Sequence, residues 1–213
     1  MRRDYISTIK IIVVGNSYTG KTSFVNRWTR GHFSNSYKTT IMSEFGYKRI
    51  SIDDCVYQVQ LWDIAGMDRH ASVAHLFLKD TAGVIVLSAV NDDDTLYDTL
   101  KWKEEIYSKV NEKGTCPMIL VQNKSDLIKE ENIKEKEEEI KGFSERNKFT
   151  NWFLTSAKSG RGVNEAMNYI IREIVDEIRN KNRKVSKEEV DDVIRCSKLT
   201  ESSFKEEKRK KCC

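Results

Sequence analysis

The sequence predicts an α/β fold in which a mostly parallel six-stranded sheet carries helices on both faces. The main observation is an alternation of short apolar runs, typical of buried strands, with longer segments of helical periodicity. A second observation is the last predicted helix, where apolar residues recur at spacings of three and four from 163 to 178. Such a stripe is expected to face the sheet. No stretch of 18 apolar residues is present, so the sequence predicts no bilayer span.

The elements follow one another in order along the chain. Strands are expected near 9–14, 44–52, 55–63, 83–90, 118–123 and 152–155. Helices are expected near 21–29, 70–79, 95–111, 131–147 and 163–181. The third strand alternates, with Tyr57, Val59 and Leu61 on one face and Gln58 and Gln60 on the other. The charge-dense stretch 130–141 is interpreted as a solvated helix face.

Residues 15–22 form the pattern G-x-x-x-x-G-K-[ST], which wraps nucleotide phosphates. The pattern lies between an apolar strand and a predicted helix, as its mechanism requires, although a glycine turn that matches by chance is an alternative. Glycines let the backbone direct N–H groups at phosphate oxygens, and the helix N-terminus adds positive charge. Lys21 is placed to reach the β- and γ-phosphates, and Thr22 to bind Mg²⁺. The expected nucleotide contacts here are Gly15, Asn16, Ser17, Tyr18, Thr19, Gly20, Lys21, Thr22 and Ser23.

A second motif, Asn123-Lys124-Ser125-Asp126, follows the apolar run 118–122. The Asp126 carboxylate can accept two hydrogen bonds from adjacent donors, and guanine offers such a pair whereas adenine does not. Asn123 and Lys124 are expected to pack along the base and to brace the phosphate loop. Residues 155–158 follow another apolar run, and their N–H groups are expected to bond the guanine carbonyl. The expected base contacts are Asn123, Lys124, Asp126, Leu127, Ser156, Ala157 and Lys158.

A third group of residues is expected around the terminal phosphate and the metal ion. Asp63 ends the third strand and can hold Mg²⁺ through a water, and Thr40 offers a hydroxyl. Gly66 can bring its N–H against a γ-phosphate because no side chain blocks the approach. Phe33 is expected either to cover the guanine face or to pack in the core. The expected magnesium ligands are Thr22, Thr40 and Asp63, and Tyr37 completes the nucleotide contacts.

Together these motifs resemble the Ras superfamily of small GTPases, and within it the Rab proteins. The resemblance covers about residues 8–180 and the last two residues, and its elements are 15–22, Thr40-Ile41, Trp62-Asp63-Ile64-Ala65-Gly66, 123–126 and 156–158. It implies the P-loop small GTPase fold, with GTP or GDP and Mg²⁺ as ligands. It also implies slow GTP hydrolysis, with Lys21, Thr40 and Gly66 around the transferred phosphoryl group.

The resemblance further implies how partners read the bound nucleotide. Rab effectors read an aromatic triad that matches Phe45, Trp62 and Phe77, beside Ile41 in the first switch. Contacts of the γ-phosphate would order the two loops around 33–45 and 64–80. Segment 149–153, with Ile64 in place of the usual threonine, is similar to the Rab branch serving lysosome-related organelles. The expected partners are effectors, an exchange factor, an activating protein, and prenylation and membrane-extraction chaperones.

Besides Ile64, two residues depart from the family pattern. Met67 stands where the family has the glutamine that orients the attacking water. A thioether accepts weakly and donates nothing, so intrinsic hydrolysis is expected to be slow. Two alternatives remain: an activating partner supplies a glutamine, or the protein is a GTP-locked scaffold with negligible turnover. Met42 replaces the glycine that usually follows Thr-Ile, and His70 is expected to be solvated or packed instead of acting as a base.

A P-loop kinase of small molecules is a further alternative. Such a kinase needs a pocket for the acceptor substrate and usually a mobile lid rich in arginine, and the sequence shows neither. The guanine motif at 123–126 also argues against it.

The charge of the chain is concentrated at its C-terminal end. The net charge of the 213 residues is +4, and residues 181–213 hold eleven Lys or Arg against seven Asp or Glu, so residues 1–180 are neutral. A neutral body argues against nucleic-acid binding. The expected organisation is an N-terminal extension at 1–7, a small GTPase domain at 8–180 and a flexible tail at 181–213.

The chain ends in Cys212-Cys213 after a basic run at 208–211. This ending is not a C-a-a-X box. It matches the double cysteine on which Rab proteins carry two geranylgeranyl chains, and two lipids anchor a protein stably. The expected location is the cytoplasmic face of an endosomal, lysosome-related or other vesicle membrane, with cycling through the cytosol. An unmodified polar tail is the alternative.

Overall fold

The computed structural model describes residues 7–35, 40, 43–64, 78–110 and 116–180. Residues up to Ile174 form one compact unit, and a second unit begins at Val175. Within the described ranges, no helix is both long and apolar enough to cross a membrane. Several predictions lie outside these ranges, namely the helix at 70–77, the extension at 1–6, the tail at 181–213, and Tyr37, Ile41, Met42, Gly66, Met67, His70, Phe77, Cys212 and Cys213.

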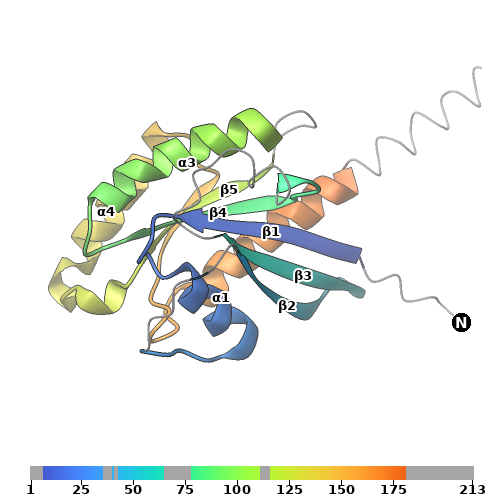
Figure 1. Ribbon diagram of the computed structural model, residues 1–213, viewed down its shortest axis with the longest axis horizontal. Coiled ribbons are helices and arrows are strands. Elements are labelled where there is room, and N and C mark those ends of the chain that lie inside the picture. Colours follow the sequence, from blue (N-terminus) through green and yellow to red (C-terminus); the bar gives the residue numbers. More distant parts are fainter. Residues whose placement is uncertain (1–6, 36–39, 41–42, 65–77, 111–115, 181–213) are drawn as a thin grey trace, which may run out of the picture. The chain divides into compact units, whose positions relative to one another are not determined.

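Six strands form one sheet in the order β2-β3-β1-β4-β5-β6 (Figure 1). Their bounds are Ser7–Gly15 (β1), Ser43–Ile52 (β2), Cys55–Ile64 (β3), Gly83–Ala89 (β4), Met118–Asn123 (β5) and Asn151–Leu154 (β6). Neighbouring strands are parallel except for β2 and β3, which are antiparallel. The predicted six-stranded, mostly parallel sheet is therefore confirmed.

The antiparallel pair is joined by a tight hairpin. Ile52 pairs with Cys55, and the two residues between them, Asp53 and Asp54, have φ angles of 46° and 64°. Positive φ at both central positions defines the type I′ turn, whose twist matches that of the flanking strands. The resulting register sets Phe45 of β2 directly opposite Trp62 of β3.

Helices cover both faces of the sheet, as predicted. They are α1 (Lys21–Arg30), α3 (Asp94–Val110), α4 (Ile133–Arg146) and the part at 163–174 of a helix that runs from 163 to 180. The helix expected from 131 begins instead with a short 3₁₀ turn, η3 (Glu130–Asn132), before α4. Figure 1 shows α3 and α4 on one face and α1 on the other.

The helix at 163–174 shares its face of the sheet with α1. Gly46, Leu61, Ile11 and Gly83 stand in one row across four strands, so all four point to the same face. A Cβ at Gly46 would lie 3.0 Å from Val25 of α1, and one at Gly83 would lie 2.7 Å from Ile174. The missing side chains let both helices approach the sheet closely.

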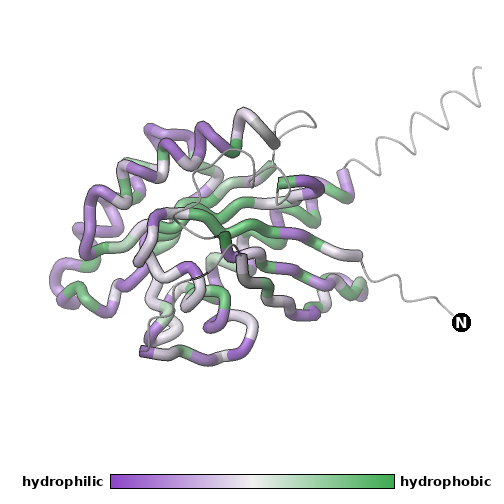
Figure 2. The backbone as a smooth tube through the Cα atoms, in the orientation of Figure 1, coloured by the Kyte–Doolittle hydropathy of each residue, from purple (hydrophilic) through white to green (hydrophobic). Residues whose placement is uncertain are grey.

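Alternate residues of the central strands supply two apolar cores. Ile12, Val84, Val86 and Leu120 pack with residues of α3 and α4 in one buried cluster. Figure 2 shows that hydrophobic residues concentrate in the central strands and that the helices contain many hydrophilic residues. The apolar stripe of the last helix is at most 2% exposed at Val163, Ala166, Met167, Ile170, Ile171 and Ile174. The prediction was wrong at Ile178, which is 36% exposed.

Candidate functional site

The phosphate-loop and base motifs meet at one edge of the sheet. Because β1, β3, β4, β5 and β6 run parallel, their carboxyl ends lie together. Gly15 ends β1, Asn123 ends β5, and residues 155–158 follow β6. The amide nitrogen Nδ2 of Asn123 donates to the carbonyl of Thr19 at 3.0 Å, across 104 positions of sequence. The two motifs therefore belong to one site.

The phosphate loop packs closely on β4. A Cβ at Gly15, whose φ is +141°, would lie 2.1 Å from the carbonyl oxygen of Leu87, so only glycine fits. Within the loop, the Thr19 hydroxyl donates to the Asn16 carbonyl at 2.9 Å. Tyr18 adopts a φ of 64° and its side chain is 67% exposed. The loop backbone is thus closed on itself, while the Tyr18 ring remains at the surface.

Lys21 lies inside the turn of this loop. Its Nζ donates to the carbonyls of Gly15 and Asn16, each at 2.9 Å, and the residue is only 6% exposed. Burial lowers the pKa of Lys21 to about 8, although the charge of Asp63 acts in the opposite direction. The loop therefore buries the Lys21 amine, and the charge of Asp63 favours its protonated form.

Two hydroxyls and one carboxylate gather beside Lys21. The Thr22 hydroxyl donates to Oδ2 of Asp63, which is fully buried at the end of β3. The hydroxyl oxygen of Thr22 lies 2.9 Å from that of Thr40. Because the proton of Thr22 goes to Asp63, Thr40 is the donor in the pair of hydroxyls. Mg²⁺ prefers oxygen ligands of this kind, so the three residues fit the predicted ion.

Asn123 also supports the loop after β6. Its Oδ1 accepts hydrogen bonds from the Ala157 N–H at 3.0 Å and from the Thr155 hydroxyl at 3.3 Å. The residue is 2% exposed, so one buried amide links the phosphate loop and the 155–158 loop. The Ala157 N–H, which was expected to bond guanine, donates to Asn123 in this structure.

Asp126 is held from the neighbouring loop. Its Oδ1 accepts from the Ser156 hydroxyl at 2.6 Å, and its Oδ2 lies 3.9 Å from the Nζ of Lys158. Asp126 lies in the short 3₁₀ helix η2 (Ser125–Leu127), which starts after Lys124 in a left-handed conformation. Burial lowers the pKa of Lys124, against the opposing charges of Asp92 and Asp126. The carboxylate and the base-motif residues therefore form one connected polar group.

The remaining expected contacts lie around this centre. Phe33 is half-buried and does not belong to the buried apolar core, and Leu127 is 59% exposed. Ser17 and Ser23 are half-buried. In the β2–β3 pair, the ring centroids of Phe45 and Trp62 lie 5.2 Å apart, with an angle of 59° between the ring planes. The Phe45 side chain is exposed. Two members of the expected effector triad are thus in contact.

Arg27 is a site residue that sequence reasoning missed. It projects from α1, and its Nε and Nη2 donate to the carbonyls of Ala157 at 2.6 Å and Lys158 at 2.5 Å. Its Nη1 donates to the carbonyl of Gly31 at 2.8 Å. Arg27 therefore ties the base loop to the helix that follows the phosphate loop. Arg27 and its partners in the base loop lie about 130 positions apart in sequence. No local sequence pattern therefore predicts these contacts.

The Ras family model matches residues 10–176 of this chain. Rat Ras-related protein Rab-7L1 is 33% identical over 180 residues, which cover 83% of this chain and 86% of that protein. Ras-related protein Rab-32A of Dictyostelium discoideum is 34% identical over 180 residues, covering 83% and 82%. The chain is a Rab protein of the Ras family. Pig Rab-32 is 30% identical to this Rab over 207 residues, covering 96% of it and 88% of the pig protein.

Family membership settles the general character of this Rab. Rab proteins are small GTPases that bind GTP and GDP with Mg²⁺ and act on intracellular membranes. They work with effectors, exchange factors, activating proteins and chaperones. The predicted family and fold are therefore confirmed.

Proposed function

We propose that this Rab is a guanine-nucleotide switch that hydrolyses GTP slowly and recruits effectors in vesicle trafficking. The observation that carries the proposal is the Asn123 side chain, which bonds Thr19 of the phosphate loop and Ala157 of the base loop. Because the Asn123 side chain bonds both loops, it holds the phosphate loop and the base loop at a fixed separation. Such an arrangement suits a ligand with a base at one end and phosphates at the other. Asp126, anchored by Ser156, supports the choice of guanine.

Hydrolysis in this proposal is an in-line attack by water. Lys21, the N–H groups of the phosphate loop and the N–H of Gly66 stabilise the charge on the phosphate oxygens. Thr22, Thr40 and Asp63 would hold Mg²⁺, which supplies further charge neutralisation at those oxygens. Met67 cannot orient the water, and intrinsic turnover is accordingly slow.

The switch acts through the loops that contain Thr40 and Gly66. Both residues contact the γ-phosphate side in the GTP state, and hydrolysis removes these contacts. Effectors then read Ile41 and the aromatic group of Phe45, Trp62 and Phe77. The contact between Phe45 and Trp62 supports this surface.

Membrane attachment in this proposal uses the end of the chain. A domain at 8–180 is followed by a flexible tail at 181–213, after a short extension at 1–7. Geranylgeranyl chains on Cys212 and Cys213, together with the basic run at 208–211, hold the protein on the cytoplasmic face of a vesicle membrane. An endosomal or lysosome-related membrane is proposed, with chaperone-assisted cycling through the cytosol.

A GTP-locked scaffold with negligible turnover is the second candidate. Met67 favours it, because every binding residue is kept while the water-positioning glutamine is replaced. Only the rate of hydrolysis separates this scaffold from a slow enzyme. A P-loop kinase is less favoured, since Asp126 would leave its charge unpaired against adenine.

Nucleotide selectivity tests the proposal. The purified protein is denatured and its bound nucleotide identified by chromatography, and affinities for guanine, xanthine and adenine diphosphates are then measured by competition. The wild type is expected to carry GDP or GTP. Asp126→Asn should bind GDP at least about 10-fold more weakly and gain affinity for xanthosine diphosphate, whose carbonyl can accept from the new amide. The control is Asp54→Asn in the β2–β3 turn. Bound adenine nucleotide in the wild type, or unchanged selectivity in Asp126→Asn, would contradict the proposal.

A further inference from the structure

The side chain of Asn16 connects the phosphate loop to α3. Its Nδ2 donates to Oδ2 of Asp98 at 2.6 Å, and its Oδ1 accepts from Nε1 of Trp102 at 3.0 Å. Asp98 and Trp102 are four residues apart on α3, and they therefore project from the same side of the helix. The two bonds bring together parts of the chain that are 82 and 86 positions apart.

The chemistry of the two partners fixes the orientation of the Asn16 amide. The indole N–H of Trp102 can only donate, and the carboxylate of Asp98 can only accept. A side chain between them must accept from one and donate to the other. The primary amide does both with its two ends, whereas a carboxylate in its place would face Asp98 with like charge.

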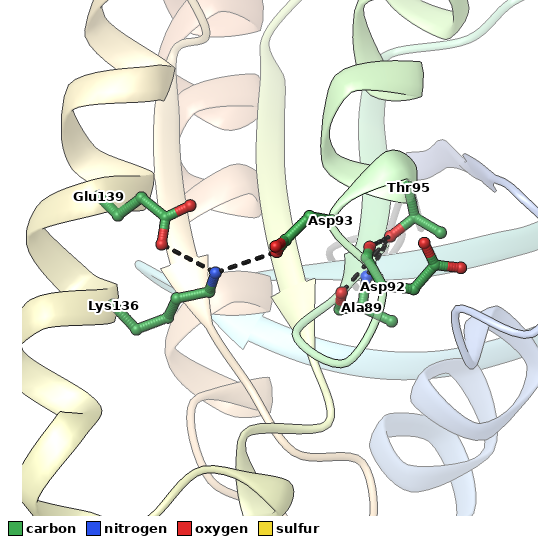
Figure 3. A network of polar contacts seen from close by, with 6 residues as sticks. All are labelled: Ala89, Asp92, Asp93, Thr95, Lys136 and Glu139. Carbon is green, nitrogen blue, oxygen red and sulfur yellow. Dashed lines mark hydrogen bonds and ion pairs between the residues drawn. The ribbon is translucent and has the colours of Figure 1, made fainter.

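Helix α3 is a firm support for these bonds. Trp102 is 7% exposed and belongs to the core cluster on this face of the sheet. At the start of α3, Thr95 accepts from the N–H of Ala89 at 2.9 Å and donates to the carbonyl of Asp92 at 2.6 Å (Figure 3). Figure 3 also shows Lys136 of α4 between Asp93 and Glu139, at 3.3 and 2.8 Å. The helix is thereby fixed to the end of β4 and to α4.

Asn16 also accepts hydrogen bonds from residues within the loop that it anchors. Its carbonyl accepts from Nζ of Lys21 and from the Thr19 hydroxyl, each at 2.9 Å. Moving the Asn16 backbone would therefore shift the partners of the lysine that the proposed function places at the phosphates. Asn16 therefore links α3 directly to the hydrogen bonds of Lys21 and Thr19.

We propose that Asn16, Asp98 and Trp102 form a latch that positions the phosphate loop and slows release of the bound nucleoside diphosphate. The inference rests on the proposed function and specifies how its site is regulated. Asp98 and Trp102 are positioning residues, since they act through Asn16. Loss of the latch is expected to speed release at least about fivefold, the effect of one to two hydrogen bonds.

The test measures dissociation of a fluorescent GDP analogue from the full-length protein at fixed Mg²⁺, in excess unlabelled GDP. Asn16→Asp places a second carboxylate beside Asp98 and should speed release. In the double variant Asn16→Asp/Asp98→Asn the two side chains exchange roles. The amide at position 98 donates to the carboxylate at position 16, and this carboxylate still accepts from the indole N–H of Trp102. Release from the double variant should return to within about twofold of the wild type, a rescue that packing alone does not predict. Lys101→Met is the matched control, because Lys101 pairs with Oδ1 of the same Asp98 at 2.6 Å but does not touch Asn16.

Trp102→Phe provides an independent arm if Asn16→Asp fails to fold. This variant loses the Nε1 donor but keeps an aromatic ring in the core, and it should also release the analogue faster. The latch is overturned if the double variant releases as fast as Asn16→Asp, or if Trp102→Phe and Asn16→Asp both match the wild type. Nucleotide content is determined first: a wild type without guanine nucleotide contradicts the proposed function itself, whereas bound GDP with equal release rates contradicts only the latch.

Discussion

The hydroxyl of Thr22 donates a hydrogen bond to the carboxylate of Asp63, and this contact joins the start of α1 to the end of β3. Thr22 belongs to the loop that is expected to bind phosphates, and Asp63 immediately precedes the second switch. The bond therefore sets two oxygen ligands side by side at the position where the nucleotide-bound metal is proposed. Because Asp63 is fully buried, its carboxylate cannot turn away to solvent.

Removal of the Thr22 hydroxyl is expected to abolish the increase in GDP affinity that Mg²⁺ provides. Thr22→Val keeps the shape of the side chain but offers no oxygen ligand, whereas Thr22→Ser keeps the hydroxyl and serves as the control. We expect GDP affinity in Mg²⁺ to fall about 10- to 100-fold in Thr22→Val. Affinity is measured by competition with and without EDTA. An equal response to EDTA in Thr22→Val and the wild type would contradict the proposed metal ligands.

Gly15 should tolerate no side chain. The Cβ of Gly15→Ala would meet the Leu87 carbonyl at 2.1 Å, while that of Gly31→Ala, at a φ of +66°, would have nothing within 4 Å. Both substitutions bear left-handed strain, but only the first adds a clash with backbone. We expect a loss of more than about 3 kcal/mol in unfolding free energy for Gly15→Ala and about 1 kcal/mol for Gly31→Ala. Urea unfolding measures both, and equal losses would show that the β1–β4 contact is looser than described.

Nucleotide binding should take up protons near pH 8. In the nucleotide-free protein burial lowers the pKa of Lys21 to about 8, so about half of the molecules carry a neutral amine at that pH. Phosphate charges favour the ammonium and raise this pKa, which means that protons are taken up on binding and that affinity falls as the pH rises through 8. Calorimetry of GDP binding in buffers of different ionisation enthalpy should give an uptake of about half a proton at pH 8 and much less at pH 7. Proton release at pH 8 would contradict the description of Lys21.

Arg27 should be irreplaceable by lysine. Arg27→Lys keeps the positive charge but loses the planar fork that reaches the carbonyls of Ala157, Lys158 and Gly31. We expect a loss of about 2 kcal/mol in unfolding free energy together with faster GDP release, because the base loop loses its tie to α1. The control is Arg30→Lys near the same helix end, where the exposed guanidinium contacts only the half-buried Asn26 side chain among the bonds described for it. Similar losses of unfolding free energy in Arg27→Lys and Arg30→Lys would mean that the guanidinium bonds of Arg27 to the base loop do not stabilise the fold.

Local patterns predicted the fold because they report what each segment must bury. The strand at 118–123 begins with a continuous apolar run, and the stripe from Val163 has helical periodicity. The site motifs were visible for a related reason: phosphate and guanine recognition place several functional residues close together in sequence.

The sequence did not predict contacts between segments that lie far apart along the chain. Arg27 looks like any charged residue at the end of an amphipathic helix, and Asp98 and Trp102 look like ordinary residues of α3. Their partners are set by how the sheet brings loop ends together. The hydrogen bond from the Ala157 N–H to Oδ1 of Asn123 at 3.0 Å was not predicted for the same reason.

Single-turnover GTP hydrolysis by the wild type is compared with that by Met67→Gln, and the bound nucleotide is identified by chromatography. We predict guanine nucleotide, slow conversion of GTP to GDP by the wild type, and hydrolysis at least about 10-fold faster in Met67→Gln, where an amide can orient the attacking water. Equal rates in the two proteins would show that residue 67 does not limit catalysis. Bound adenine nucleotide would contradict the guanine switch altogether.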